Sequence, residues 1–292
     1  MKLFTLIHIC GSEQSIHNNS FVKNFDAQIS LYLNCAKQLH SSLKNAGIEL
    51  AIITNDKASL QRLNSDHYPI ELIQLDFTLK VPSGIKFYSA HFKIEVFQYL
   101  STLTNDYVGL IDADMVCINP VPQAFKNIIE DKLPVYYNIT DQISPAYGQD
   151  EILKDKRKLS KTNPAGIWAG GEFLTGTPSF FDKVYKEITA FLPGYFSDFN
   201  SFNHQGDEML TSVALENLMV RGEATIIDAG VLGIIGRYWS PKTLHVQKQV
   251  DAYMDHFILH LPSDSERVVN FSTFKTPIYL LTCISHIHAM KV

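Results

Sequence analysis

The residues whose types and spacing point most clearly to chemistry are two aspartates that end a short apolar run. Residues 107–111 are largely apolar, and Asp112 and Asp114 follow them. In an extended chain, side chains two residues apart point to the same side, so both carboxylates can face one cation. Beyond the carboxyl end of a strand, where α/β sheets bind ligands, two such carboxylates repel each other unless a divalent ion or a metal–polyphosphate complex neutralises them. The pair therefore predicts a cation site.

Two kinds of chemistry use such a pair. In the first, the aspartates hold a metal ion that binds the diphosphate of a nucleotide-sugar, and the sugar passes to a hydroxyl group. In the second, Asp112 attacks a phosphate and Asp114 acts as the acid, as in haloacid-dehalogenase-type phosphohydrolases, which this segment resembles locally. That family has its nucleophile after the first strand, whereas more than a hundred residues of α/β pattern precede Asp112. Its later Gly-Asp-x-x-x-Asp motif is also missing, because Thr211 follows Gly206 and Asp207 where the second aspartate belongs, so the phosphohydrolase is the alternative.

The elements that must position these aspartates follow an alternating pattern. A continuous apolar run at residues 3–10 is typical of a strand buried on both faces, and further strands are predicted at residues 49–53, 70–75 and 107–111. Between the first two of these strands, Leu33, Ala36 and Leu43 recur with the spacing of one helix face. Alternating strands and helices predict an α/β fold whose mainly parallel central sheet is flanked by helices.

The second half of the chain is less regular. Thr177 followed by Pro178 predicts a helix start, because a hydroxyl residue caps the helix and proline suits its first position. Further elements are predicted from the apolar pattern: strands at residues 134–139 and 224–235, a helix at residues 206–219, and a charged surface loop or short helix at residues 151–161.

Composition excludes several classes of protein. Hydrophobic residues make up 46% of the 292 residues, which is enough for a buried core and excludes disorder as the main state. The net charge of −5 offers no basic surface for a nucleic-acid backbone, so we expect no nucleic-acid partner. The four cysteines lack disulfide-framework or zinc spacing, which favours reduced thiols and a cytoplasmic location. The apolar segment 277–285 is too short to cross a bilayer, and peripheral membrane contact through it is the alternative to packing on the domain.

Four blocks, in the same order, resemble glycosyltransferases of the glycogenin-like and lipopolysaccharide galactosyltransferase-like type. Residues 91–94 and the aspartate pair resemble the Phe-x-Lys and Asp-x-Asp block of these enzymes. Residues 170–176 resemble their glycine-rich acceptor-side strand, and residues 204–208 resemble their Asp-Gln-opened helix. Residues 257–260 resemble the strand whose histidine completes the metal site. The resemblance implies a single Rossmann-like GT-A domain, with a nucleotide-sugar-binding half at 1–120 and a less regular acceptor-side half at 121–292.

The resemblance also implies a set of site residues. Mn²⁺ or Mg²⁺ would be coordinated by Asp112, Asp114 and His260. The nucleotide-sugar would be bound by Ile9, Cys10, Gly11, Asn55, Asp56, Lys93, Asp112, Ala113 and Asp114. The candidates for contact with the reacting sugar or the acceptor are Asp207, Glu208 and Glu172. These roles imply transfer from a UDP-sugar to a glycan or another hydroxyl-bearing acceptor, with retention of anomeric configuration.

The sequence departs from the family after His260. Leu261, Pro262 and Ser263 stand where the family has a glycine and a Lys-Pro pair that grips the diphosphate, so this clamp would pass to Ser263 or Arg267, or be absent. Two further alternatives stay open. A nucleotidyltransferase would need a basic, glycine-rich loop after the first strand, and a carbohydrate-binding module would bind saccharides without a nucleotide.

Overall fold

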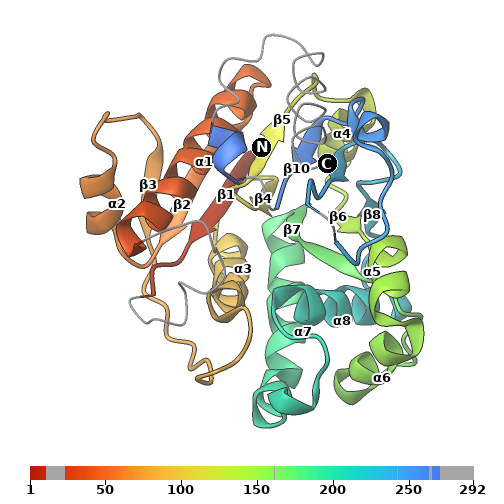
Figure 1. Ribbon diagram of the computed structural model, residues 1–292. Helices are drawn as coiled ribbons and strands as arrows, with labels where there is room; N and C mark the ends of the chain where they lie inside the picture. Colours follow the sequence, from red (N-terminus) through yellow and green to blue (C-terminus); the bar gives the residue numbers. More distant parts are fainter. Residues whose placement is uncertain (11–23, 161, 242, 263–264, 270–292) are drawn as a thin grey trace.

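The computed structural model describes residues 1–10, 24–160, 162–241, 243–262 and 265–269, without the side chains of Glu266 and Arg267 (Figure 1). Several sequence-based predictions lie outside the described part: Gly11, Ser263, the Arg267 side chain and the segment 277–285. Among the described helices, none combines the length and the apolarity that a membrane crossing requires.

A seven-stranded sheet forms the centre of the molecule, with the strand order β3–β2–β1–β4–β7–β6–β8. The strands are β1 (Lys2–Ile7), β2 (Glu49–Thr54), β3 (Glu71–Gln74), β4 (Val108–Ile111), β6 (Val135–Asn138), β7 (Ala169–Gly176) and β8 (Ile227–Asp228). Neighbouring strands pair in parallel except at β7, which runs antiparallel to both β4 and β6. The predicted mainly parallel sheet is confirmed.

Helices surround this sheet, as the sequence pattern predicts (Figure 1). Their bounds are α1 (Phe25–Asn45), α2 (Lys57–Leu63), α3 (Lys93–Ser101), α4 (Gln123–Glu130), α5 (Thr140–Tyr147), α6 (Gln149–Leu159), α7 (Pro178–Ser197), α8 (Asp207–Val220) and α9 (Ser265–Val268). The predicted start of α7 is confirmed, because the Thr177 side chain accepts a hydrogen bond from the Phe180 amide at 3.2 Å. Helix α8 packs on β7 and on α7, which in turn packs on α3.

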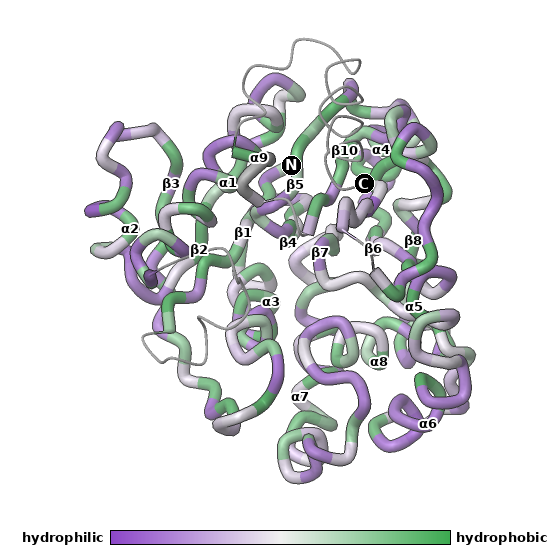
Figure 2. Tube along the Cα trace, in the orientation of Figure 1, coloured by the Kyte–Doolittle hydropathy of each residue, from purple (hydrophilic) through white to green (hydrophobic). Residues whose placement is uncertain are grey.

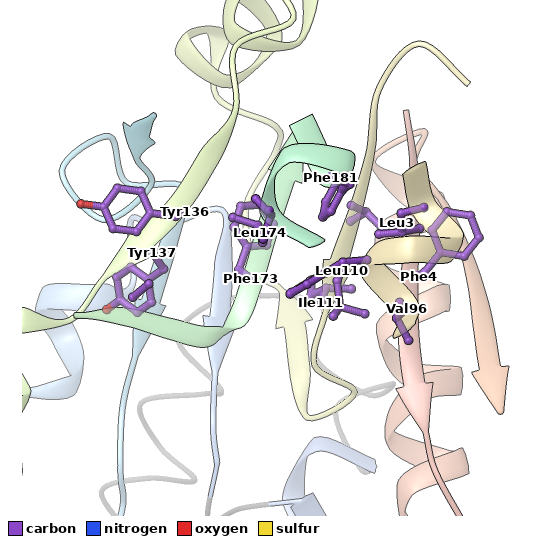
Figure 3. Packing of buried hydrophobic residues seen from close by; sticks show 14 of the residues in the cluster. Leu3, Phe4, Val96, Leu110, Ile111, Tyr136, Tyr137, Phe173, Leu174 and Phe181 are labelled. Atoms are coloured by element: carbon purple, nitrogen blue, oxygen red, sulfur yellow. The ribbon is translucent and has the colours of Figure 1, made fainter. Parts of the chain in front are cut away.

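The core follows the register of the sheet. Phe4, Leu110, Leu174 and Tyr136 are register partners across β1, β4, β7 and β6, and all four are buried (Figure 3). This row joins the parallel strands of the first half to the antiparallel pairing around β7. The two halves of the sequence therefore share one hydrophobic core.

A small second sheet adjoins the end of β4. It consists of β5 (Met115–Cys117), β10 (Ile258–His260) and β9 (Ile235–Arg237), in that order. Strand β10 runs antiparallel to β5 and parallel to β9, so His260 lies opposite Met115 and beside Arg237. This sheet places His260 of β10 opposite the residue that follows Asp114.

Two predictions for the second half have different outcomes. Of the two forms predicted for the charged segment 151–161, a surface loop or a short helix, the helix is confirmed, because the segment belongs largely to α6, which is mostly hydrophilic in Figure 2. The predicted strand 224–235 is wrong as a continuous element, because only Ile227–Asp228 pair in the large sheet and β9 begins at Ile235. Ala229 and Gly230 turn the chain between them, where Gly230 donates its amide to Asp228 at 2.8 Å.

Candidate functional site

The predicted cation ligands lie together at the carboxyl end of β4. Asp112 and Asp114 follow β4, and the pairing of β10 with β5 brings His260 beside them. One ligand atom from each of the three residues lies within 4.8 Å of the other two. The Nε2 atom of His260 is 3.2 Å from Oδ1 of Asp114. Two carboxylates and one imidazole form a donor set that fits Mn²⁺, with carboxylates that also suit Mg²⁺.

Lys93 is a buried cation that joins three parts of the site. Its ammonium group, on the first residue of α3, lies 2.7 Å from a carboxylate oxygen of Asp112 and 2.7 Å from one of Asp207. It also donates to the Gly171 carbonyl of β7 at 2.9 Å. Burial alone would lower the pKa of Lys93, but the two carboxylates outweigh burial and raise it. Lys93 therefore stays charged and holds the end of β4 to the start of α8.

The environment of Asp112 opposes its ionisation in the absence of a cation. Burial, together with the nearby charge of Asp114, raises the pKa of Asp112 to about 6, although Lys93 acts in the opposite direction. A cation beside two adjacent carboxylates favours their charged forms. The Asp112 amide donates to the Glu172 carbonyl at 2.9 Å, which fixes this turn against β7.

Glu172 lies behind the cation site and is almost fully buried, with 1% of its side chain exposed. It is 3.2 Å from Nδ1 of His260 and 3.4 Å from the Arg237 guanidinium. Burial would raise the pKa of Glu172, but Arg237 and His260 lower it to about 2. An ionised Glu172 accepts a hydrogen bond from Nδ1 of His260, so Nε2 faces Asp114. The structure therefore places Glu172 where it orients the His260 ring.

The start of α8 carries the other two acidic candidates. Asp207 is bound by Lys93, and 12% of its side chain is exposed. Glu208 accepts from the indole nitrogen of Trp168 at 3.0 Å and pairs with Arg237 at 3.1 Å, yet 32% of its side chain remains exposed. Arg237 thus pairs with both Glu172 and Glu208. Through Arg237 and Glu172, these contacts connect the start of α8 to His260.

Two glycines of strand β7 leave room for the carboxylates of Asp207 and Glu172. A Cβ atom on Gly171 would lie 2.1 Å from a carboxylate oxygen of Asp207, and one on Gly170 would lie 2.2 Å from a carboxylate oxygen of Glu172. Any side chain at either position would therefore displace an acidic group. The two glycines allow the carboxylates to lie directly against the strand.

A cavity of about 590 Å³ opens beside the cation ligands. Among the predicted nucleotide-sugar residues, its lining includes Ile9, Cys10, Lys93, Asp112, Ala113 and Asp114. Two other parts of this lining were not predicted from the sequence; they come from the first turns of α1 and from residues 84–90. In the second segment, the glycine at position 84 is a sequence signal of a turn, and its φ is 81°.

Asn55 and Asp56, the two residues after β2 that were predicted to bind the nucleotide-sugar, do not line this cavity. The amide side chain of Asn55 accepts from the Ile9 backbone nitrogen at 2.7 Å and donates to the Ile9 carbonyl at 2.8 Å. Asn55 lines a second cavity, of about 480 Å³, which shares His8 with the first. Asp56 caps α2 and accepts from the backbone nitrogen of Ser59 at 2.9 Å. Asn55 thus holds the end of β1 in place, and Asp56 begins a helix.

The chain matches no protein-family model and no curated protein. It does resemble solved structures. An active-site mutant of LgtC superposes with a TM-score of 0.51 and 11% identity, over 93% of this chain and 95% of that chain. The galactosyltransferase LgtC in complex with donor and acceptor sugar analogues gives a TM-score of 0.50 and 10% identity, over 96% and 99% of the two chains.

WbbM, a bifunctional glycosyltransferase solved in its apo form, gives a TM-score of 0.50 and 11% identity over 89% of this chain. The match covers 45% of WbbM, so this chain spans less than half of that protein. At these identities the likeness concerns the fold. The α/β architecture described above is the architecture of these glycosyltransferases.

Proposed function

We propose that this protein is a divalent-cation-dependent glycosyltransferase that uses a nucleotide-diphosphate sugar, most simply a UDP-sugar, as its donor. The acceptor would be a hydroxyl group of a glycan or another molecule. The observation that carries the proposal is the meeting of Asp112, Asp114 and His260 at the carboxyl end of β4. Support comes from the fold, which LgtC and WbbM share, and from the cavity beside these ligands.

In this proposal, Asp112, Asp114 and His260 hold Mn²⁺ or Mg²⁺, which supplies Lewis-acid stabilisation of the charge on the leaving diphosphate. Lys93 fixes Asp112 and Asp207 relative to each other through its two ion pairs. Residues lining the cavity orient the donor, because correct placement of the two reactants removes much of the entropic barrier.

The three acidic candidates are proposed to differ in role. Glu208 keeps 32% of its side chain exposed and is the best placed to contact the donor sugar or the acceptor. Asp207 is more buried and neutralised by Lys93. Glu172 is buried and paired with His260 and Arg237, so we assign it to positioning His260 rather than to contact with substrate.

The phosphohydrolase alternative is less consistent with the structure. In that family the nucleophilic aspartate follows the first strand, whereas Asp112 follows β4, the fourth strand along the chain. One of its carboxylate oxygens is also 2.7 Å from the Lys93 ammonium group. Release of phosphate from an aryl phosphate, abolished by Asp112→Asn, would restore this alternative.

The experiment that tests the proposal compares nucleotide binding and sugar transfer with and without Mn²⁺. Wild-type protein should bind UDP in the presence of Mn²⁺ and lose donor hydrolysis when EDTA is added. Asp114→Asn removes a ligand charge and should lower turnover by about 100-fold or more, with unchanged circular dichroism. The matched control is Asp106→Asn, whose side chain is 85% exposed, and it should behave like the wild type. Normal transfer by Asp114→Asn, or activity indifferent to EDTA, would contradict the cation role.

The stereochemical outcome also remains a prediction. We expect retention of the anomeric configuration, which proton NMR of the first product would show. An inverted product would leave the donor and cation proposals intact and change only the role of Glu208.

A further inference from the structure

Phe87 combines an unfavourable backbone conformation with an exposed aromatic ring. It adopts the left-handed region, with φ 54° and ψ 40°, and 58% of its surface is exposed. Bulky residues rarely adopt this conformation, and such strain concentrates at ligand sites. Three non-glycine residues of the described chain have positive φ: His67, Phe87 and Lys132. Of these three, Phe87 is the one that lines the cavity beside Asp112 and Asp114.

A buried chain of hydrogen bonds holds Phe87 in this conformation. The Phe87 carbonyl accepts from the Ala90 amide at 2.9 Å and from Nδ1 of His91 at 3.0 Å. Because Nδ1 of His91 donates and burial lowers the pKa of this residue, Nε2 accepts a hydrogen bond from the Tyr195 hydroxyl at 3.0 Å. The Tyr195 oxygen in turn accepts from the Gly206 amide at 2.9 Å.

The segment before α8 also holds Phe87 from the other side. The side chain of Gln205 accepts from the Lys86 amide at 2.8 Å. Gly206 has a φ of 101°, and a Cβ atom built on it would lie 3.2 Å from Cβ of Phe87. Phe87 therefore lies between the cavity that Asp112 and Asp114 line and the residue that precedes Asp207.

We propose that Phe87 is a sugar-binding residue whose ring packs against the C–H face of a pyranose at this end of the cavity. The inference rests on the proposed function and adds a contact to it. A sugar ring presents apolar C–H groups on its face and hydroxyl groups around its edge. The exposed phenyl ring, which lines the cavity, matches this face. The sugar is that of the donor or that of the acceptor.

The test uses Phe87→Gly, which removes the ring and the strain together. Glycine adopts positive φ without cost, and the ring is exposed, so the melting temperature should stay unchanged or rise. In the presence of Mn²⁺, the affinity for UDP should stay unchanged. If the ring contacts the donor sugar, the affinity for UDP-galactose or UDP-glucose should fall by about five-fold to ten-fold, the size expected for one aromatic contact. If it contacts the acceptor sugar, KM for methyl β-galactoside should rise instead.

His67→Gly is the matched control, since His67 also has positive φ (51°) but lies in an exposed turn outside the cavity lining. It should leave both affinities and KM unchanged, and Phe87→Tyr should retain wild-type sugar binding. A lower melting temperature for Phe87→Gly, with unchanged binding in both arms, would show a structural role and overturn the inference alone. If the wild type binds neither UDP nor a UDP-sugar, the proposed function fails, and the inference fails with it.

Discussion

At the scale of single residues, Glu172 illustrates how burial decides a role. Sequence resemblance suggests Glu172 as a candidate for contact with substrate, because it lies in a glycine-rich strand. In the structure it is enclosed, pairs with Arg237 and accepts a hydrogen bond from His260. Carboxylates behind a ligating histidine fix its tautomer and ring orientation and increase its basicity. In the proposed cation site, Glu172 would therefore act through His260.

Glu172→Gln should weaken Mn²⁺ binding by about 10-fold to 100-fold, because the amide removes the charge that orients and polarises His260. Isothermal titration with Mn²⁺ in the presence of UDP measures this change directly. Glu49→Gln, at an exposed position at the start of β2, is the control and should bind Mn²⁺ like the wild type. Wild-type Mn²⁺ affinity combined with a large loss of turnover would instead mean that Glu172 contacts the substrate.

At the scale of elements, a buried ion pair connects α6, α8 and the segment that leads into β7. Lys156 of α6 is fully buried, pairs with Glu216 of α8 and donates to the Ile167 carbonyl at 2.5 Å. Glu216 also accepts from the backbone nitrogens of Ala165 and Gly166. Both charges thus hold the segment that places the glycines and Glu172 of β7. The sequence predicts a surface loop or a short helix here, and this buried pair packs the segment as a helix against α8.

Lys156→Met should lower the free energy of unfolding by about 3–5 kcal/mol, since it leaves the buried charge of Glu216 without its partner. Urea denaturation measures the loss. Lys154→Met, on the same helix but with 63% of its side chain exposed, should change stability by no more than about 0.5 kcal/mol. Equal stabilities for the two variants would show that the buried pair contributes no net stabilisation.

At the scale of the whole molecule, the site exists only because distant segments meet (Figure 1). Lys93 starts α3, Asp112 follows β4, Asp207 starts α8, and His260 ends β10. Their ion pairs cross from the parallel half of the sheet to the antiparallel half. Because these charged residues come from different elements, both ligand binding and stability depend on the complete fold.

Burial lowers the pKa of two histidines, His8 and His91, and this contributes to the pH dependence of stability. Burial lowers the pKa of His8 from 6.5 to about 4, despite the nearby charge of Glu95, so the unfolded chain binds a proton more readily than the folded one between these values. The contribution of His8 is therefore complete above pH 6.5 and is lost as the pH falls toward 4. His91, whose pKa burial also lowers, adds a loss of the same sign.

His8→Gln should consequently reduce the loss of unfolding free energy between pH 7 and pH 5, measured by urea denaturation at both values. His67→Gln, at an exposed turn, should keep the wild-type difference. A wild-type difference in His8→Gln would mean that other groups account for the acid sensitivity of the fold.

Much of the fold could be predicted from the sequence because it depends on local properties. Apolar patterns predict β1, β2, β3 and β4, and the threonine–proline pair predicts the start of α7. The Asp-x-Asp spacing after β4 places two carboxylates together without any knowledge of the rest of the chain. The resemblance to known motifs predicted His260 as a third ligand, and the structure places His260 close to the two aspartates.

The sequence by itself therefore determined the alternation of strands and helices and the position of the aspartate pair. Tertiary structure alone decided that Lys93 bridges Asp112 to Asp207, that Glu172 stands behind His260, and that Phe87 lines the cavity. The physical reason is the separation in sequence over which each kind of interaction acts. Hydrophobic period and capping act over a few residues, whereas these contacts depend on strand order and on pairing between segments up to 114 residues apart.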